Sequence, residues 1–134
     1  MTILDDLTNQ MIQLAGSIDA PTRLLPSIGE EKLDSHPYVD YHNSDYHYIV
    51  RERGKEILHR QTASMDELLF WVFEAVTFEM SVAYELSHRE PHRDPRRLIF
   101  QHQLHLLAKL NATWESRQER EVEDLLRHHP FTEK

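Results

Sequence analysis

The sequence predicts a small α+β protein in which a three-stranded antiparallel meander packs on a bundle of about three to four helices. Three observations indicate this fold class. Residues 64–89 contain neither Gly nor Pro and form a run too long for a strand. Residues 38–61 consist of short alternating segments separated by turn residues, which is typical of strands. Residues 95–129 return to a helical period after a break that contains proline.

A chain of 134 residues is long enough to bury a hydrophobic core without covalent cross-links, so we expect a single domain over residues 1–134. The sequence has no cysteine, which excludes disulfides, thiolate metal sites and a cysteine nucleophile. The first residues lack the basic region and apolar run of a signal peptide, so a cytoplasmic location is expected.

The net charge of −8 is unevenly distributed along the chain. Residues 1–48 hold eight acidic residues against only Arg23 and Lys32, which gives this stretch a net charge of −6. Nucleic acid and anionic membranes both require a basic surface, so direct binding to either is disfavoured. A basic protein partner is favoured, although ordinary solubility charge explains the same composition.

The first predicted helix covers residues 2–18. Its apolar residues recur at intervals of three and four: Leu4, Leu7, Met11, Leu14 and Ile18. The helix is too short for a coiled coil, so we expect it to pack on the domain or on a copy of itself, which would form a homodimer. The Pro and Gly residues between 17 and 37 predict a connecting loop.

Residues 38–61 predict the meander, with turns at Asn43-Ser44-Asp45 and at Arg53-Gly54. A two-residue turn at Arg53-Gly54 fixes the pairing of the second and third strands. It pairs Glu52 with Lys55, Arg51 with Glu56, Val50 with Ile57 and Ile49 with Leu58. Opposite charges then face each other, as do apolar side chains, which supports this register.

The core helix is predicted over residues 64–89, where Ser64 and Glu67 form a capping box. Fourteen of the 20 residues from Glu67 to Leu86 are apolar, so the helix should be covered on several sides. A membrane span is disfavoured because carboxylates recur through the run. These are Glu74, Glu79 and Glu85.

Glu79 stands out because it shares a helical direction with apolar residues. These are Leu68, Val72, Ala83 and Leu86. A buried carboxylate needs a cationic or hydrogen-bonding partner. We therefore predict that Glu79 is largely buried and forms a structural ion pair or hydrogen bond with Arg96, Arg97 or Gln103. The alternatives are a less buried helix face, or a small enzyme that uses Glu79 with Arg96 or His102 in an open pocket.

Residues 95–129 begin after Asp94-Pro95, which predicts an N-cap followed by proline at the first helical position. Arg96, Gln103 and several apolar residues share one stripe of this segment. Asn111 to Thr113 leave open whether the segment is one helix or two. Arg96 and Arg97 at the helix start also fit an anion-binding site.

Signatures of catalysis are missing from the sequence. It has no Gly-rich phosphate loop and no Gly-x-Ser-x-Gly motif. The ten histidines suggest a metal, but His102 with His105, and His42 with His47, supply only two ligands each. We therefore expect no catalytic residues, no metal and no cofactor.

Several short motifs follow one another in a characteristic order. They are Pro37-Tyr38, Tyr46-His47-Tyr48, Glu52-Arg53-Gly54, Thr62, Asp66-Glu67-Leu68-Leu69, Tyr84-Glu85-Leu86, Arg89, Asp94 with Arg96-Arg97, Phe100, Trp114 and Pro130-Phe131. This order resembles the bacterial polymorphic-toxin immunity proteins, and within them immunity protein family 63. The resemblance implies a non-enzymatic α+β protein that binds the effector domain of a toxin encoded beside it. A regulatory or scaffolding subunit that dimerises through the first helix is a further hypothesis.

The residues between Tyr38 and Tyr48 are the predicted partner surface. They include four tyrosines, two histidines and two aspartates, and tyrosines are enriched at binding hot spots. Strand alternation directs Tyr46 and Tyr48 towards the core, where packing alone explains them. The predicted partner-binding residues lie at the turn: Asp40, Tyr41, His42 and Asp45. Their acidic surroundings would attract a basic effector domain such as a nuclease.

Overall fold

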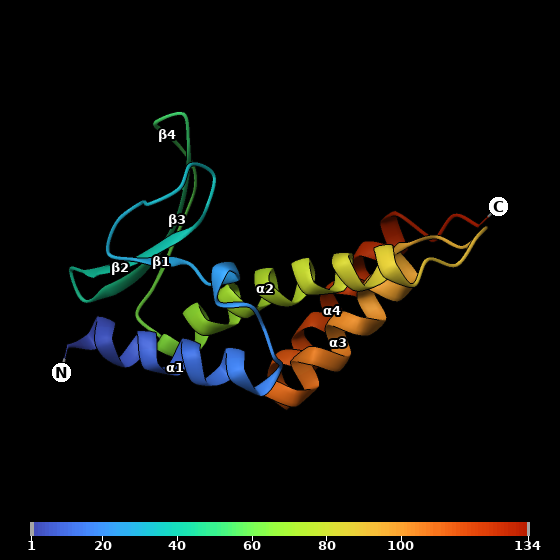
Figure 1. The fold of residues 1–134 in the computed structure, drawn as a ribbon, viewed down its shortest axis with the longest axis horizontal. Coiled ribbons are helices and arrows are strands. Elements are labelled where there is room, and N and C mark those ends of the chain that lie inside the picture. The colour runs from blue at the N-terminus through green and yellow to red at the C-terminus, as the bar shows by residue number, and fades with distance from the viewer. Residues whose placement is uncertain (1, 134) are drawn as a thin grey trace. The chain divides into compact units, whose positions relative to one another are not determined.

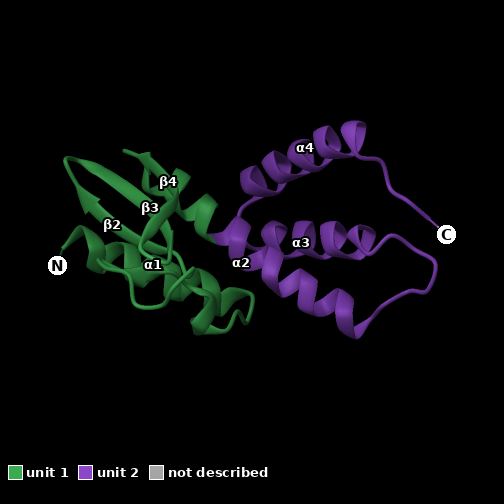
Figure 2. Cartoon of the chain, turned by 90° about the horizontal axis from the view of Figure 1, so that it is seen from above, with its two compact units in different colours: residues 1–72 green, residues 73–134 purple. Residues whose placement is uncertain are grey.

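The computed structural model describes residues 2–133 and confirms the α+β class (Figure 1). The elements are α1 (Ile3–Ser17), the 3₁₀ turn η1 (Thr22–Leu24), β1 (Ser27–Ile28), β2 (Tyr38–His42), β3 (Asp45–Glu52), β4 (Lys55–Thr62), α2 (Met65–Ser87), α3 (Arg96–Leu110) and α4 (Ala112–His128). The chain divides into two compact units, Met1–Val72 and Phe73–Lys134 (Figure 2). Helix α2 begins in the first unit and ends in the second.

The sheet of the first unit has four strands in the order β1-β2-β3-β4. Strands β2, β3 and β4 form the predicted antiparallel meander. Strand β1 pairs parallel to β2 and corrects the prediction, which placed a loop there. The pairing depends on Ser27, which donates its N–H to the Pro37 carbonyl 3.0 Å away. A strand of two residues has no detectable period, so sequence pattern alone does not reveal it.

Both hairpin turns have two residues with positive φ. These are Asn43 (53°), Ser44 (66°), Arg53 (52°) and Gly54 (76°). Such backbones belong to type I′ turns, whose twist matches that of the adjoining strands. Asp45 was predicted to lie in the first turn, but it begins β3 opposite His42.

The register between β3 and β4 matches the prediction only near the turn. Arg51 pairs with Glu56 as expected, but a shift at Val50 and Arg51 then pairs Val50 with Leu58 instead of Ile57. Beyond the shift, Ile49 accordingly faces His59 rather than the predicted Leu58. The side chains of β4 are mostly exposed, so no buried face holds the predicted register in place.

Helix α1 packs against β2 (Figure 1) and buries Leu7, Met11 and Ala15. Thr2 caps the helix in a capping box with Asp5, and the two hydrogen bonds are both 3.1 Å. The first turns of α2, up to Val72, complete the core of this unit. Ser64 caps α2 as predicted, because its hydroxyl accepts the N–H of Glu67 at 3.1 Å. No helix within residues 2–133 is long and apolar enough to cross a membrane.

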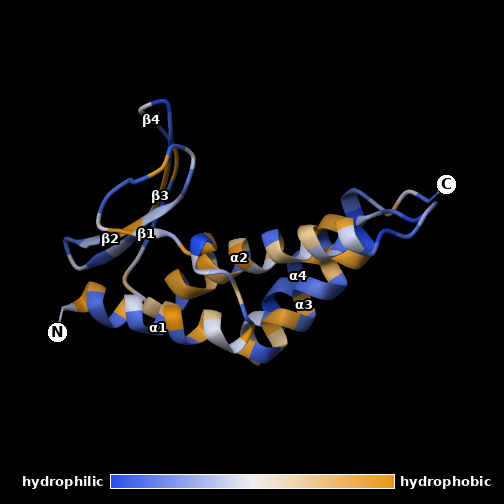
Figure 3. Ribbon diagram, viewed as in Figure 1, coloured by the Kyte–Doolittle hydropathy of each residue, from blue (hydrophilic) through white to orange (hydrophobic). Residues whose placement is uncertain are grey.

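The second unit is helical, and residues 95–129, for which the sequence left open one helix or two, form two helices. Asn111 has an extended backbone and accepts the N–H groups of Thr113 and Trp114 on its side chain, at 2.9 and 3.2 Å. This cap ends α3 and starts α4, so the segment is two helices that lie side by side. The colouring in Figure 3 shows polar residues along most of α4. The bundle also buries several polar residues: Thr77, Ser81 and Glu85 of α2, Gln103 of α3 and Gln118 of α4.

Candidate functional site

The hairpin of β2 and β3 places three of the predicted partner-binding residues, Asp40, His42 and Asp45, on one face of the sheet, and Tyr41 on the other face beside Tyr46. Asp45 is the register partner of His42, and both flank the two-residue turn. The Asp40 carboxylate accepts the N–H of Tyr41 at 2.8 Å and lies 3.7 Å from Nδ1 of His42. All four side chains are exposed or half-buried, so this end of the sheet is accessible.

Tyr41 also has a structural role, because its ring packs on the ring of Tyr46 with centroids 4.9 Å apart. Tyr46 and Tyr48 are both buried, as strand alternation predicted. Burial is the main cause that raises the pKa of Tyr46, and the nearby groups of Tyr41 and Asp6 raise it further. The Tyr46 phenol is therefore neutral, and its ring packs against the Tyr41 side chain of the hairpin.

A histidine cluster beside the turn was not predicted. The ring of His42 stacks on that of His47, with centroids 3.8 Å apart and planes within 1°. Nδ1 of His47 lies 2.8 Å from Nε2 of His59, and Nδ1 of His59 lies 2.9 Å from Oε1 of Glu56. The cluster thus joins β2, β3 and β4.

The register shift explains why the cluster was missed. The predicted register places His47 and His59 on opposite faces of the sheet, because alternate residues of a strand point to opposite sides. The shift pairs His47 with Gln61 instead, and His59, two residues away, then shares the face of His47.

The chain of contacts ends at an oxygen atom on each side. Nε2 of His47 lies 3.4 Å from the carbonyl oxygen of His42, and Nδ1 of His59 faces the Glu56 carboxylate. The two imidazole rings thus link the backbone of β2 to a side chain of β4.

The arrangement favours hydrogen bonding over metal binding. Within the described part of the chain, no three His, Asp or Glu residues are placed to hold a metal ion. His102 and His105, the other pair considered, have ring centroids 6.3 Å apart. His102 stacks on Tyr84 at 4.0 Å, and its pKa is lowered first by burial and then by neighbouring positive groups.

The prediction for Glu79 is wrong, because its side chain is exposed. In the first unit α2 is buried on the face of Leu68 and Val72, but in the second unit that face is open and Leu86 is exposed. The buried line has moved to Thr77, Ser81 and Glu85, at intervals of four residues. Among residues 2–133, no hydrogen bond or ion pair joins Glu79 to Arg96 or His102, the partners that the enzyme hypothesis assigned to it.

Gln103, one of the predicted partners of Glu79, binds other groups of α2. Gln103 donates from Nε2 to the Glu74 carbonyl at 3.0 Å and to Thr77 Oγ1 at 3.3 Å, so it does join α3 to α2. Glu85 instead holds Arg89 in a two-bond ion pair, at 2.9 and 3.1 Å.

Arg96 and Arg97 are both occupied by carboxylates of the chain itself. Arg96 binds the buried Asp94 at 2.9 Å, and Arg97 pairs with Glu133. Arg96 also donates to the carbonyls of His129 and Pro130, at 2.9 and 2.8 Å. The predicted anion site is thus the attachment point of the C-terminal segment.

Comparison with known proteins adds one result. A family model described as Immunity protein 63 matches residues 42–124, which is more than half of the chain. No curated protein and no solved structure matches it. The matched range starts at the last residue of β2, so it contains β3, β4, α2 and α3 but neither α1 nor β1.

Proposed function

The chain belongs to the Immunity protein 63 family, and we propose that it binds the effector domain of a cognate toxin and neutralises it through a non-covalent complex. The family match carries this proposal. The protein would act as a binding protein rather than an enzyme, in the cytoplasm of the cell that makes the toxin.

We place the interface at the exposed end of the β2–β3 hairpin, on Asp40, Tyr41, His42 and Asp45. Tyrosine offers a large contact area with a polar tip, and two carboxylates give the surface negative charge. The first 48 residues carry a net charge of −6, which would speed association with a basic effector domain such as a nuclease.

The local structure supports this choice because the hairpin is held in shape before binding. The type I′ turn, the His42–His47 stack and the Tyr41–Tyr46 contact all restrict it. A surface that is already ordered loses less conformational entropy when a partner binds.

The test uses Asp40→Lys and Tyr41→Ala in calorimetric titrations against an inactive form of the effector domain, and in co-expression with the active toxin. Both variants should bind at least tenfold more weakly and fail to protect cells. Glu79→Lys is the matched control, because it makes the same change of charge at an exposed position of the second unit.

Thermal unfolding of each variant separates lost binding from lost folding, which matters for Tyr41 because of its contact with Tyr46. Undiminished affinity in both variants would move the interface to another surface. If the wild-type chain itself neither binds nor protects, the proposed function is wrong.

A further inference from the structure

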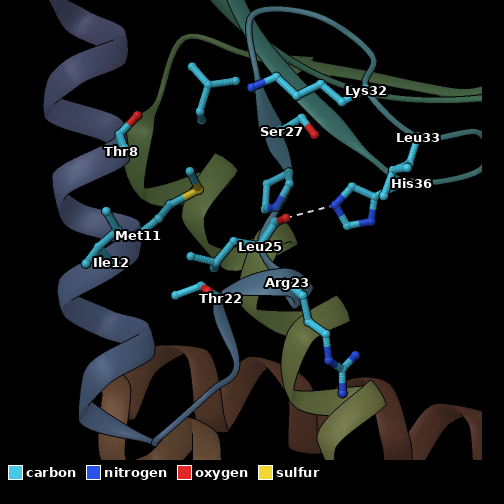
Figure 4. Close-up of a pocket in the computed structure, with 12 residues that line it drawn as sticks. Thr8, Met11, Ile12, Thr22, Arg23, Leu25, Ser27, Lys32, Leu33 and His36 are labelled. Carbon is cyan, nitrogen blue, oxygen red and sulfur yellow. Dashed lines mark hydrogen bonds between the residues drawn. The ribbon is translucent and has the colours of Figure 1, made fainter.

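The first unit contains a surface pocket of about 420 Å³ between α1 and residues 22–36. Figure 4 shows Met11 of α1 extending towards Leu25, and Ile12 lines the same pocket from the next position of the helix. Met11 is buried at the base, whereas Ile12 is 53% and Leu33 is 65% exposed. The pocket therefore offers apolar side chains to a ligand and lies within the size range of protein ligand sites.

Positive charge accompanies this apolar surface. Arg23 and Lys32 are the only Arg and Lys among residues 1–48, and both line the pocket, at opposite ends in Figure 4. No acidic residue lines it. Among residues 2–133, neither cation has a hydrogen-bonding or ion-pair partner. An acidic region of the chain thus holds one site suited to an anion that carries apolar groups.

Strand β1 adds a third feature, because it is an edge strand of the sheet. Ser27 and Gly29 donate their N–H groups towards β2, to Pro37 at 3.0 Å and Val39 at 2.7 Å. Because alternate residues of a strand direct their backbone groups to opposite sides, the N–H and C=O of Ile28 point away from β2. Ile28 also lines the pocket. Such an edge can pair with an extended chain, which a small molecule does not use.

We propose that the pocket receives an extended segment of the effector domain in which a large apolar side chain lies next to an acidic one. The segment pairs with the backbone of Ile28, places its apolar side chain against Ile12 and Leu33, and directs its carboxylate to Lys32 or Arg23. This inference rests on the proposed function and deepens it.

The position of the pocket suggests its purpose. All of its lining residues precede residue 42, where the family match begins. The matched part supplies the shared scaffold, and the pocket supplies contacts that distinguish one cognate effector from others.

The experiment measures affinity for the inactive effector domain by calorimetry. The pocket variants are Leu33→Asp and the double reversal Arg23→Glu/Lys32→Glu. Their matched controls are Ile57→Asp, at a position 57% exposed, and the double reversal Arg53→Glu/Lys55→Glu at the β3–β4 turn. We expect each pocket variant to bind at least tenfold more weakly and each control to bind within about twofold of wild type.

The charge reversals are a stringent test because they make the protein more acidic. If attraction between an acidic protein and a basic effector were the whole interaction, both double reversals would bind more tightly. Weaker binding only in Arg23→Glu/Lys32→Glu therefore requires a local acidic contact at the pocket.

The other outcomes overturn the inference. Wild-type affinity in both pocket variants removes the pocket from the interface, while the proposed function stands. A wild-type dimer, seen by sedimentation and lost in the pocket variants, assigns the pocket to a second copy of the chain. Saturable binding of decanoate without any change in effector affinity assigns it to a small amphipathic carboxylate. Failure of the wild-type chain to bind the effector overturns the proposed function and this inference with it.

Discussion

Replacement of Asp94 by Asn should destabilise the second unit much more than the same change at an exposed ion pair. The Asp94 side chain is only 5% exposed. Its carboxylate accepts hydrogen bonds from the Arg96 guanidinium at 2.9 Å, the Arg96 backbone at 3.0 Å and the Thr132 backbone at 2.9 Å. Asp94 therefore attaches the C-terminal segment to the start of α3.

The expected size follows from these contacts. Removal of one partner from a buried ion pair costs about 3 to 5 kcal/mol. Arg96 is 28% exposed, so it stays partly hydrated, and it keeps its bonds to His129 and Pro130. We therefore expect a loss of about 2 kcal/mol. At about 2.1 cal/mol/K of unfolding entropy per residue, this lowers the melting temperature by roughly 7 °C.

Asp124→Asn is the control, because Asp124 binds Arg127 at 2.8 Å but is 63% exposed. Exposed pairs contribute about 0 to 1 kcal/mol, so its melting temperature should change by no more than about 4 °C. Circular dichroism during heating measures both variants at pH 7. Equal melting temperatures in the two variants would refute the reasoning.

The dependence on pH gives a second check. The Arg96 guanidinium, and after it the Thr132 N–H, hold the pKa of Asp94 well below its usual range. A carboxyl group with a lowered folded-state pKa stabilises the protein above its ordinary pKa of about 3.9, and this contribution disappears as the pH falls below that value. The difference in the free energy of unfolding between wild type and Asp94→Asn should therefore decrease as the pH falls from about 5 towards 2. A difference that stays constant would contradict the assignment.

Two further predictions concern buried polar groups of the bundle. Ser81 is fully buried, and its hydroxyl has no hydrogen-bond partner within residues 2–133, so Ser81→Ala should raise stability to urea by about 0.5 to 1 kcal/mol. A loss of stability would reveal a partner. Burial lowers the pKa of His102, so the folded state binds fewer protons than the unfolded state and stability should fall as the pH drops from 7.5 to 5.5. His102→Gln should reduce this fall, and an unchanged fall would refute the prediction.

The helices were predictable because their signals are local in the sequence. Ser64 lies three residues before Glu67, and in the structure the Ser64 hydroxyl accepts a hydrogen bond from the Glu67 N–H. Asn111 is an equally local signal, but the sequence alone does not decide whether a helix ends there. In the structure its side chain accepts the N–H groups of Thr113 and Trp114, and this cap separates α3 from α4. Local chemistry thus fixes where a helix can start, and the surrounding contacts decide whether it does.

The sheet was less predictable because its pairing depends on contacts between distant segments. Strand β1 is held to the sheet by backbone hydrogen bonds from Ser27 and Gly29 to residues about ten positions later in the chain. The shift at Val50 and Arg51 moved His59 to the face of His47, so the histidine cluster followed from a detail of register. An exposed strand such as β4 has no buried face that would disclose this detail.

The residues that indicate the family differ from those that we propose to contact the effector domain at the pocket. Glu85 with Arg89, and Asp94 with Arg96, belong to the motifs that carry the family resemblance, and each binds the other member of its pair. Their charges are thus engaged within the chain itself. Arg23 and Lys32 lie outside the match and have no partner among residues 2–133. Under the proposed function, Arg23 and Lys32 would contact the effector domain, and they lie outside the region that the family model matches.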